Sequence, residues 1–410
     1  MPSSPSLTST LEERAGLTAQ ELSRPAAAEE LEPLPSLLPP EGVTAARVRD
    51  VTARVRGMAS GRVDVAGVRG SAGAVLAAAI ARLPRRVVLI TSDLDSARRA
   101  AEDVGFLARG SLDDAAEDTG EGEVLVFAAC EASPYADVNP DRRAAMSRVA
   151  TLFHLAHQRP WSVLVAPASA LVRKVVPRKE LARRADRVVT EQEIDRDGLV
   201  LSLAEAGYLR VPVVEDPGSF AVRGALLDVW PPSSDAPVRV ELYGDLVLSM
   251  KSFDPVDQTT RKDAPELSQL WLSPVHEAIL DRRNLARARE RITQLAEAMD
   301  WPTTKTRALV DDVLHGRAFF GAEGYLPAYY EELDPLLAYV PADAVVVLDD
   351  PPAITRAVRE ELERATADAT QKEGSAPTFL PEAFYRDEAA VATDLASRTV
   401  VPLHRTAVAG

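Results

Sequence analysis

The sequence has little of what disulfide-bonded, secreted or membrane-spanning proteins require. It contains one cysteine, Cys130, in 410 residues, so no internal disulfide can form. No run of about 18 apolar residues is present, which excludes an ordinary transmembrane helix. No charged and then apolar leader precedes the first predicted domain. These absences favour a cytoplasmic protein that makes no membrane contact.

Basic residues are also in deficit. The chain has 47 Lys and Arg against 62 Asp and Glu, a net charge of −15. Binding nucleic acid over a broad face needs clustered Lys and Arg, so this balance argues against such a face but allows a local basic patch. The composition, 46% hydrophobic and 27% charged, is that of a globular protein, and the length suits two to four domains.

Strands that alternate with helices predict a parallel α/β body. The first 42 residues hold seven prolines and seven glutamates and are expected to be a disordered leader, with one short helix around 17–22. Helices are then predicted at 43–58, 72–83, 95–108 and 141–157, with strands near 63–67, 86–92, 124–127 and 161–166. This alternation is typical of βαβ units and a parallel sheet.

The pattern changes after residue 171. Short β-rich runs at 187–190, 211–215, 220–230, 238–243 and 247–253, with one helix at 199–206, predict an inserted α+β domain with an antiparallel meander. Helices at 282–299, 304–314 and 352–365 and strands at 344–348 and 399–403 follow, with a linker at 368–377. The predicted division is 1–42, leader; 43–172, first part of the body; 173–258, insert; 259–400, second part of the body; 401–410, start of a linker.

A glycine-rich turn lies between a predicted strand and helix, where nucleotide-binding proteins hold phosphate. It spans residues 67–75 and includes Gly67, Gly70, Ser71, Gly73 and Ala74. In a functional phosphate-binding loop, the positions of Gly73 and Ala74 carry a lysine and a hydroxyl, which contact phosphate and Mg²⁺. The loop is therefore a degenerate version or a plain turn, and neither supports hydrolysis.

Other candidates for chemistry have simpler structural explanations. Asp349 and Asp350 end an apolar strand, as in a metal-holding Walker B strand, but an Asp before Pro also starts many turns. His154 and His157 lie three residues apart with no further ligand to complete a zinc set. Cys130 has no histidine partner and is expected in the core. We therefore predict no catalytic residue and no metal site.

The insert carries the pattern of a protein interface. Arg210 precedes one predicted strand and Arg223 lies on the next, with the aromatics Phe220 and Trp230 nearby. Arginine and tryptophan are favoured at interfaces because they combine large contact area with directed hydrogen bonds. The alternative is that the aromatics are core residues and the arginines are solvated.

Several stretches, in order, resemble the amino-terminal part of the bacterial transcription-repair coupling factors, which is itself similar to the UvrB subunit of the excision nuclease. They cover roughly residues 45–400 and are 131–135, 148–155, 163–171, 206–211, 217–229, 238–245, 252–255 and 337–343. The longest reads Pro-Gly-Ser-Phe-Ala-Val-Arg-Gly-Ala-Leu-Leu-Asp-Val. The resemblance implies a RecA-like body of the P-loop type, here degenerate, with domains 1a and 1b and an inserted domain 2.

In this family domain 2 recruits the UvrA repair ATPase, which implies UvrA-binding roles for Arg210 and Arg223 and, more weakly, for Phe220, Leu227 and Trp230. Ala221 stands where UvrB-like sequences often carry a second arginine. Only 136–140 separate Tyr135 from the next helix, too few residues for the damage-probing hairpin of UvrB. That shortness and the degenerate loop both favour the coupling factor.

Family members are much longer than this chain. Their RNA polymerase-binding domain and their DNA translocase motor, which uses ATP and Mg²⁺, follow this module. We therefore expect the chain to be a non-catalytic adaptor fragment without a cofactor of its own, able to contact the missing domains. The alternatives are a UvrB-like ATPase and a RecA-like scaffold unrelated to repair.

Overall fold

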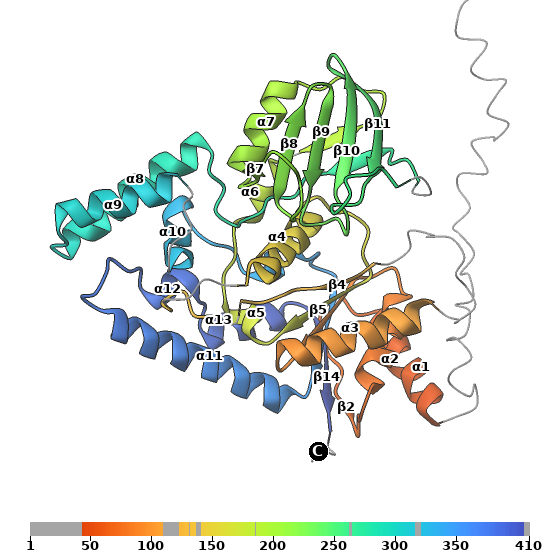
Figure 1. Ribbon diagram of the computed structural model, residues 1–410. Helices are drawn as coiled ribbons and strands as arrows, with labels where there is room; N and C mark the ends of the chain where they lie inside the picture. The colour runs from red at the N-terminus through yellow and green to blue at the C-terminus, as the bar shows by residue number, and fades with distance from the viewer. Residues whose placement is uncertain are drawn as a thin grey trace, which may run out of the picture.

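The computed structural model describes residues 43–109, 123–130, 132–136, 141–184, 186–261, 265–315 and 321–405. The expected leader and its short helix at 17–22 lie outside these residues, as does Glu131 of the matching stretches. Within the described residues the chain forms an α/β body and a separate β-rich insert (Figure 1).

The body is built on a parallel sheet, as predicted. Its strand order is β1-β14-β13-β3-β5-β4, with β2 also pairing with β14. The central strands are continuous apolar runs, as expected where both faces of a sheet are covered. The bounds are β1 Gly61–Arg62, β2 Val65–Ala66, β3 Val87–Thr91, β4 Val124–Val126, β5 Val163–Pro167, β13 Val345–Asp349 and β14 Thr399–His404.

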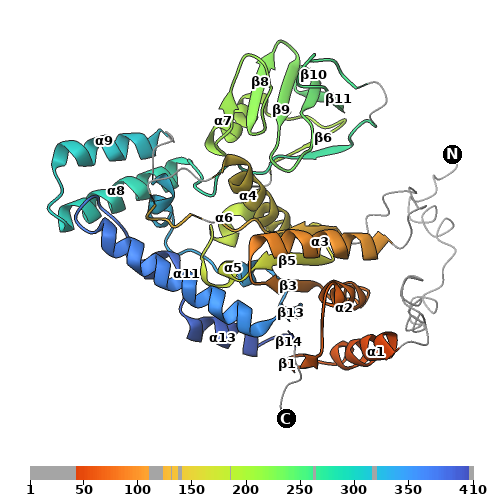
Figure 2. The ribbon, with the colours of Figure 1, turned by 60° about the horizontal axis from the view of Figure 1, so that its bottom comes forward.

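Helices cover both faces of this sheet (Figure 2). In β3, Val87 and Leu89 belong to one hydrophobic core, while Val88 and Ile90 belong to the other. On the first face lie α1 Val43–Arg56, α2 Ala72–Ala81 and α3 Leu94–Arg109. Helices on the second face include α4 Arg142–Ala156, α5 Ser169–Val172, α6 Arg178–Ala182, α11 Pro351–Lys372 and α13 Glu388–Ala396.

The second core also takes in a helical hairpin and short helical turns from the carboxy-terminal half. The hairpin projects from the body at the left of Figure 1. These elements are α8 Arg282–Ala298, α9 Thr303–Leu314, η1 Ala322–Tyr325, α10 Leu326–Tyr329, η2 Leu336–Tyr339 and α12 Pro381–Phe384.

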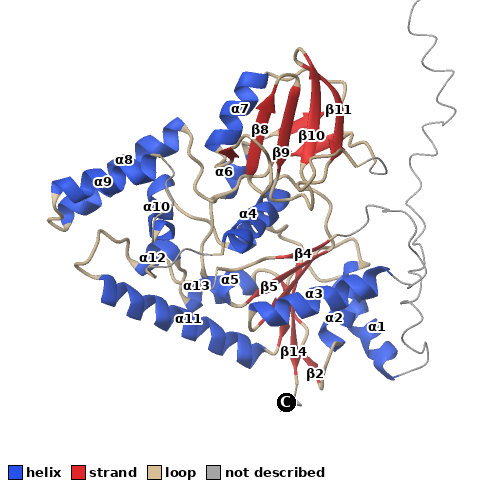
Figure 3. Ribbon diagram, in the orientation of Figure 1, coloured by secondary structure: helices blue, strands red, loops and turns tan. Residues whose placement is uncertain are grey.

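The insert is a five-stranded sheet of order β11-β10-β9-β8-β7 with α7 Arg196–Glu205 beside it (Figure 3). The strands β8 Ser219–Arg223, β9 Leu226–Trp230, β10 Val238–Tyr243 and β11 Leu246–Ser252 form the predicted antiparallel meander. The short strand β7 Leu209–Arg210 pairs with β8 in parallel. The fold class is thus the predicted one: an α/β body with a parallel sheet and an inserted antiparallel domain.

Some predicted boundaries are corrected by the structure. The run 211–215 is not a strand; only Leu209 and Arg210 pair with β8. The expected linker at 368–377 begins inside α11, which continues to Lys372. Strand β14 extends through His404, so the first residues of the range 401–410 belong to the sheet.

The insert also occupies a different range from the predicted 173–258. Strand β12 Gln269–Trp271 pairs with β6 Arg187–Val189, and Val275 belongs to the core of the insert. At the other end, Val176 and Leu181 belong to the core of the body. Among the described helices, none is long and apolar enough to cross a membrane.

Candidate partner-binding site

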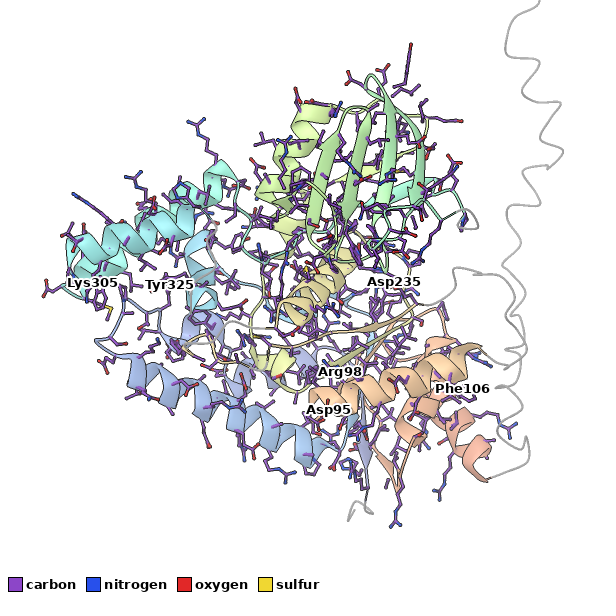
Figure 4. The ribbon with its side chains drawn as sticks, viewed as in Figure 1. Asp95, Arg98, Phe106, Asp235, Lys305 and Tyr325 are labelled. Carbon is purple, nitrogen blue, oxygen red and sulfur yellow. The ribbon has the colours of Figure 1, made fainter. Side chains whose placement is uncertain are left out.

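The sheet of the insert has one face covered by α7 and one face that a smaller cluster around Phe253 covers only in part. Phe220 and Leu227 pack with residues of α7 in the core of the insert. Side chains alternate along a strand, so Arg223 and Asp228 project from the opposite side, which we call the open face. Figure 4 labels Asp235 in the β9–β10 connection, at the end of the sheet nearer the body. Consecutive turns of a meander lie at opposite ends, so the β8–β9 turn beside Arg223 lies at the far end.

The open face holds one carboxylate between two arginines. Asp228 has no exposed surface and lies across from Ala221 on β8 and Arg239 on β10. Nη2 of Arg223 donates to Oδ2 of Asp228. Arg239 donates from Nε to Oδ1 at 2.7 Å and from Nη2 to Oδ2 at 3.0 Å. These hydrogen bonds raise the pKa of Arg239 above its usual value. The three residues, the Asp228 cluster, carry a net charge of +1.

Arg210 lies apart from this cluster. It is exposed on β7, at the edge of the sheet, and pairs in register with Phe220. Paired residues of neighbouring strands point to the same face, so Arg210 projects from the α7 side and Arg223 from the open face. The neighbouring side chains Leu209 and Val213 are 61% and 38% exposed, which gives this edge an apolar surface around the charge. A partner that contacts both arginines must therefore reach around the β7 edge.

The weaker candidates from the sequence differ in exposure. Phe220 and Leu227 are each 1% exposed and pack under α7, so they are core residues and not surface contacts. Trp230 is half-buried and packs near Ala221 and Phe253 on the open face, with Nε1 donating to the carbonyl of Ser234 at 3.0 Å. Trp230 therefore remains partly available at this face.

The glycine-rich loop lies between a strand and a helix, as a phosphate-binding loop does, but lacks the side chains of such a loop. It connects β2 to α2, and Gly67 and Gly70 have φ values of 75° and 57°, which favour glycine. A Cβ on Gly73 would lie 3.3 Å from Cδ1 of Leu403 and 3.7 Å from Oδ1 of Asp349. The structure thus brings the two degenerate nucleotide motifs together. Neither Gly73 nor Ala74 offers an ammonium or hydroxyl group, so this site does not fit Mg-nucleotide.

The carboxylates at the end of β13 have partners within the protein. Burial raises the pKa of Asp349; Arg405 opposes this shift and Asp350 adds to it. Arg405 lies 3.0 Å from Asp350. Among the residues that the structure describes, no group of three His, Cys, Asp or Glu side chains could hold a metal ion.

The remaining candidates pack inside the body. Nε2 of His154 lies 2.9 Å from the carbonyl of Pro160, and burial lowers the pKa of His154. The His157 ring packs against Phe153 and Trp271, and burial lowers its pKa as well. Cys130 is buried. The structure gives these side chains packing roles.

Sequence reasoning missed a second group of charges, the Glu277 cluster, which is buried beside the insert. Arg148 on α4 donates from Nε to Glu277 at 2.5 Å and lies 3.4 Å from Glu323, which Arg173 also approaches at 3.6 Å. Burial alone raises the pKa of Glu323, but Arg148 and Arg173 bring it below its usual value. The sequence signal was weak, because Arg148 and Glu323 lie 175 positions apart in the chain.

Comparison with known proteins finds a family model that matches the insert and relatives that match most of the chain. Residues 187–277 match the family model described as the UvrB interaction domain, which agrees with the β6-to-Val275 range of the insert core.

About 70% of the chain is similar to proteins named transcription-repair-coupling factor. The protein from Myxococcus xanthus is 37% identical over 322 residues, covering 76% of this chain and 26% of that protein. The Escherichia coli K12 protein is 30% identical over 280 residues, covering 68% and 23%. The Bacillus subtilis 168 protein is 28% identical over 319 residues, covering 74% and 25%. The chain spans about a quarter of the length of these relatives. With its α/β body and its UvrB interaction domain, the chain is a relative of the transcription-repair coupling factors and is similar to their UvrB-like amino-terminal module.

Proposed function

We propose that this chain is a non-catalytic adaptor that recruits the UvrA repair ATPase to stalled RNA polymerase in transcription-coupled nucleotide excision repair. The observation that carries the proposal is Arg223, whose side chain is 41% exposed and held against the buried Asp228 within the UvrB interaction domain. An exposed arginine with free donors suits a carboxylate on a partner, because a charge-assisted hydrogen bond from a guanidinium is stronger than one between neutral groups.

The rest of the proposed interface follows from the exposed side chains of the insert. Arg210 with Leu209 and Val213 would form one side of the contact, at the β7 edge, and Arg223 with Trp230 the other. In this proposal RNA polymerase, DNA, ATP and Mg²⁺ are bound by regions of the longer relatives outside the part that matches this chain. Contact between this module and those regions would be intramolecular in the whole protein.

Titration of purified UvrA against the chain at physiological ionic strength tests the proposal. We expect binding, and we expect Arg210→Ala/Arg223→Ala to weaken it by tenfold or more, since an anchoring arginine contributes about 1–2 kcal/mol or more. The matched control is Arg282→Ala/Arg289→Ala, which removes the same charge from the exposed face of α8. Failure of the parent chain to bind, or equal losses in both double variants, would contradict the proposal.

The non-catalytic part of the proposal has its own measurement. A ligand at a hundredfold excess over its Kd stabilises a protein by about 2.7 kcal/mol. Because Gly73 and Ala74 replace the required lysine and hydroxyl, we expect millimolar Mg-ATP to leave the melting temperature unchanged. A clear rise would favour the alternative of a UvrB-like nucleotide-binding protein.

A further inference from the structure

The two arginines of the Asp228 cluster are held in different ways. Arg239 is engaged on every side: two of its nitrogens contact Asp228, its Nη1 donates to the carbonyl of Gln258 at 3.1 Å, and its guanidinium carbon lies 4.6 Å from the centre of the Phe253 ring. Its side chain is 13% exposed. Arg239 therefore has little left to offer a partner and serves to hold the carboxylate.

Arg223 touches the same carboxylate through one nitrogen only. Its Nη2 contacts Oδ2 of Asp228, and among the described residues its Nε and Nη1 have no hydrogen-bond acceptor. The side chain opposite Asp228 on β8 is Ala221, whose single methyl group leaves the space between Arg223 and the carboxylate clear. The guanidinium is thus fixed at one corner, and two of its nitrogens remain free.

We infer that Asp228 is a positioning residue for the partner contact: with Arg239 it fixes the Arg223 guanidinium so that Nη1 can donate to a carboxylate of the partner, and Nε to a second acceptor. This inference rests on the proposed function. A long side chain loses conformational freedom when it binds, and fixing it beforehand reduces that loss. Without the charge of Asp228, the guanidinium groups of Arg223 and Arg239, which both donate to its Oδ2, would repel each other, and Arg223 would move away.

A double-mutant cycle on UvrA affinity tests the inference with the full chain. The variants are Asp228→Asn, Arg223→Ala and the two combined. We expect Asp228→Asn to weaken binding about tenfold in the parent chain and less than twofold when Arg223 is already alanine. Residues that act as a unit give such non-additive effects.

A matched control separates positioning from stability. Val240→Ala removes buried volume from the covered face of the same sheet, where Val240 is fully buried. All variants are compared at a temperature at which circular dichroism reports them folded. We expect Val240→Ala to keep the parent affinity and its salt dependence, while Arg223→Ala reduces that salt dependence, because it removes the charge that faces the partner.

The outcomes also separate this inference from the proposed function. If the parent chain does not bind UvrA, both fail. If Arg223→Ala weakens binding but Asp228→Asn weakens it equally in both backgrounds, Asp228 acts independently of Arg223, and only the positioning role is overturned. Parent-like affinity of Asp228→Asn overturns it as well.

Discussion

The Glu277 cluster and the Asp228 cluster use the same ingredients for different ends. In the first, the Arg148 and Glu277 side chains are 6% and 7% exposed, and the charges face one another inside the protein. In the second, Asp228 is fully buried, but the Arg223 side chain is 41% exposed, and two of its nitrogens have no acceptor among the residues that the structure describes. A closed set of charges fixes the fold, whereas an open set leaves directed hydrogen bonds for a partner.

Breaking the Glu277 cluster has the largest expected effect on stability. Arg148→Ala leaves the buried Glu277 without its cation and the partly buried Glu323 with Arg173 alone, and loss of one partner of a buried ion pair costs about 3–5 kcal/mol. We expect urea denaturation to show this loss, with UvrA affinity unchanged where the protein is folded. Arg143→Ala, an exposed position on the same helix, serves as the control and should change stability by less than about 0.5 kcal/mol. Equal losses for both variants would contradict the comparison.

Reversing the charge of Arg223, the exposed member of the Asp228 cluster, should have an intermediate effect on stability. The sequence alone suggests that Arg223→Glu affects binding only, but the new carboxylate would face the buried Asp228. Arg239 still holds Asp228 through two nitrogens, so we expect a loss of about 1–3 kcal/mol, together with loss of UvrA binding. Arg223→Gln, which adds no repulsion, should lose binding with less destabilisation. A fully stable Arg223→Glu protein would show that the charge at position 223 does not interact with Asp228.

Loss of an exposed ion pair should have the smallest effect on stability, because exposed charges contribute less than buried ones. Asp64 accepts from Nε of Arg62 and lies 2.8 Å from Nε2 of His404, and the Arg62 hydrogen bond chiefly lowers its pKa from 3.8 to about 2. A lowered carboxyl pKa stabilises the fold above pH 3.8, and this contribution disappears as pH falls toward 2. Asp64→Asn should therefore cost less than about 1 kcal/mol at pH 7 and progressively less below pH 4. Urea denaturation at several pH values measures the stability difference between the parent chain and the variant. A difference that does not change with pH would contradict the prediction.

The body of the fold could be predicted from the sequence because its central strands are marked by short, continuous apolar runs. The runs 87–91, 163–167 and 345–349 are almost entirely apolar and lie between helical patterns. The end of α11 was missed because its last turns are polar; there Thr366 and Thr370 donate to carbonyls four residues earlier, while Ala369 packs on the core. The limit of the insert was missed because β12 has three residues and pairs with a strand about 80 positions away.

The candidate site could be predicted from the sequence only in part, because it depends on how segments distant in the chain pack together. Alternation places Phe220 and Arg223 on opposite faces, but only the position of α7 decides which face is covered. The role of Asp228 was not visible, because a single acidic residue in an apolar strand gives no indication of a cation on the next strand. Arg239 becomes its partner through the β9–β10 register alone.

Glu277 also joins the two ends of the insert. One of its oxygens receives Arg148, and the other accepts the backbone N–H of Val176 at 2.9 Å, just before the chain leaves the body. Tyr330 and Tyr339 donate to the carbonyls of Glu277 and Val176, respectively. The points of departure and return are thus neighbours in space, although they are a hundred residues apart in the chain. Such a junction lets evolution add, remove or exchange the whole intervening domain without altering a strand of the parallel sheet.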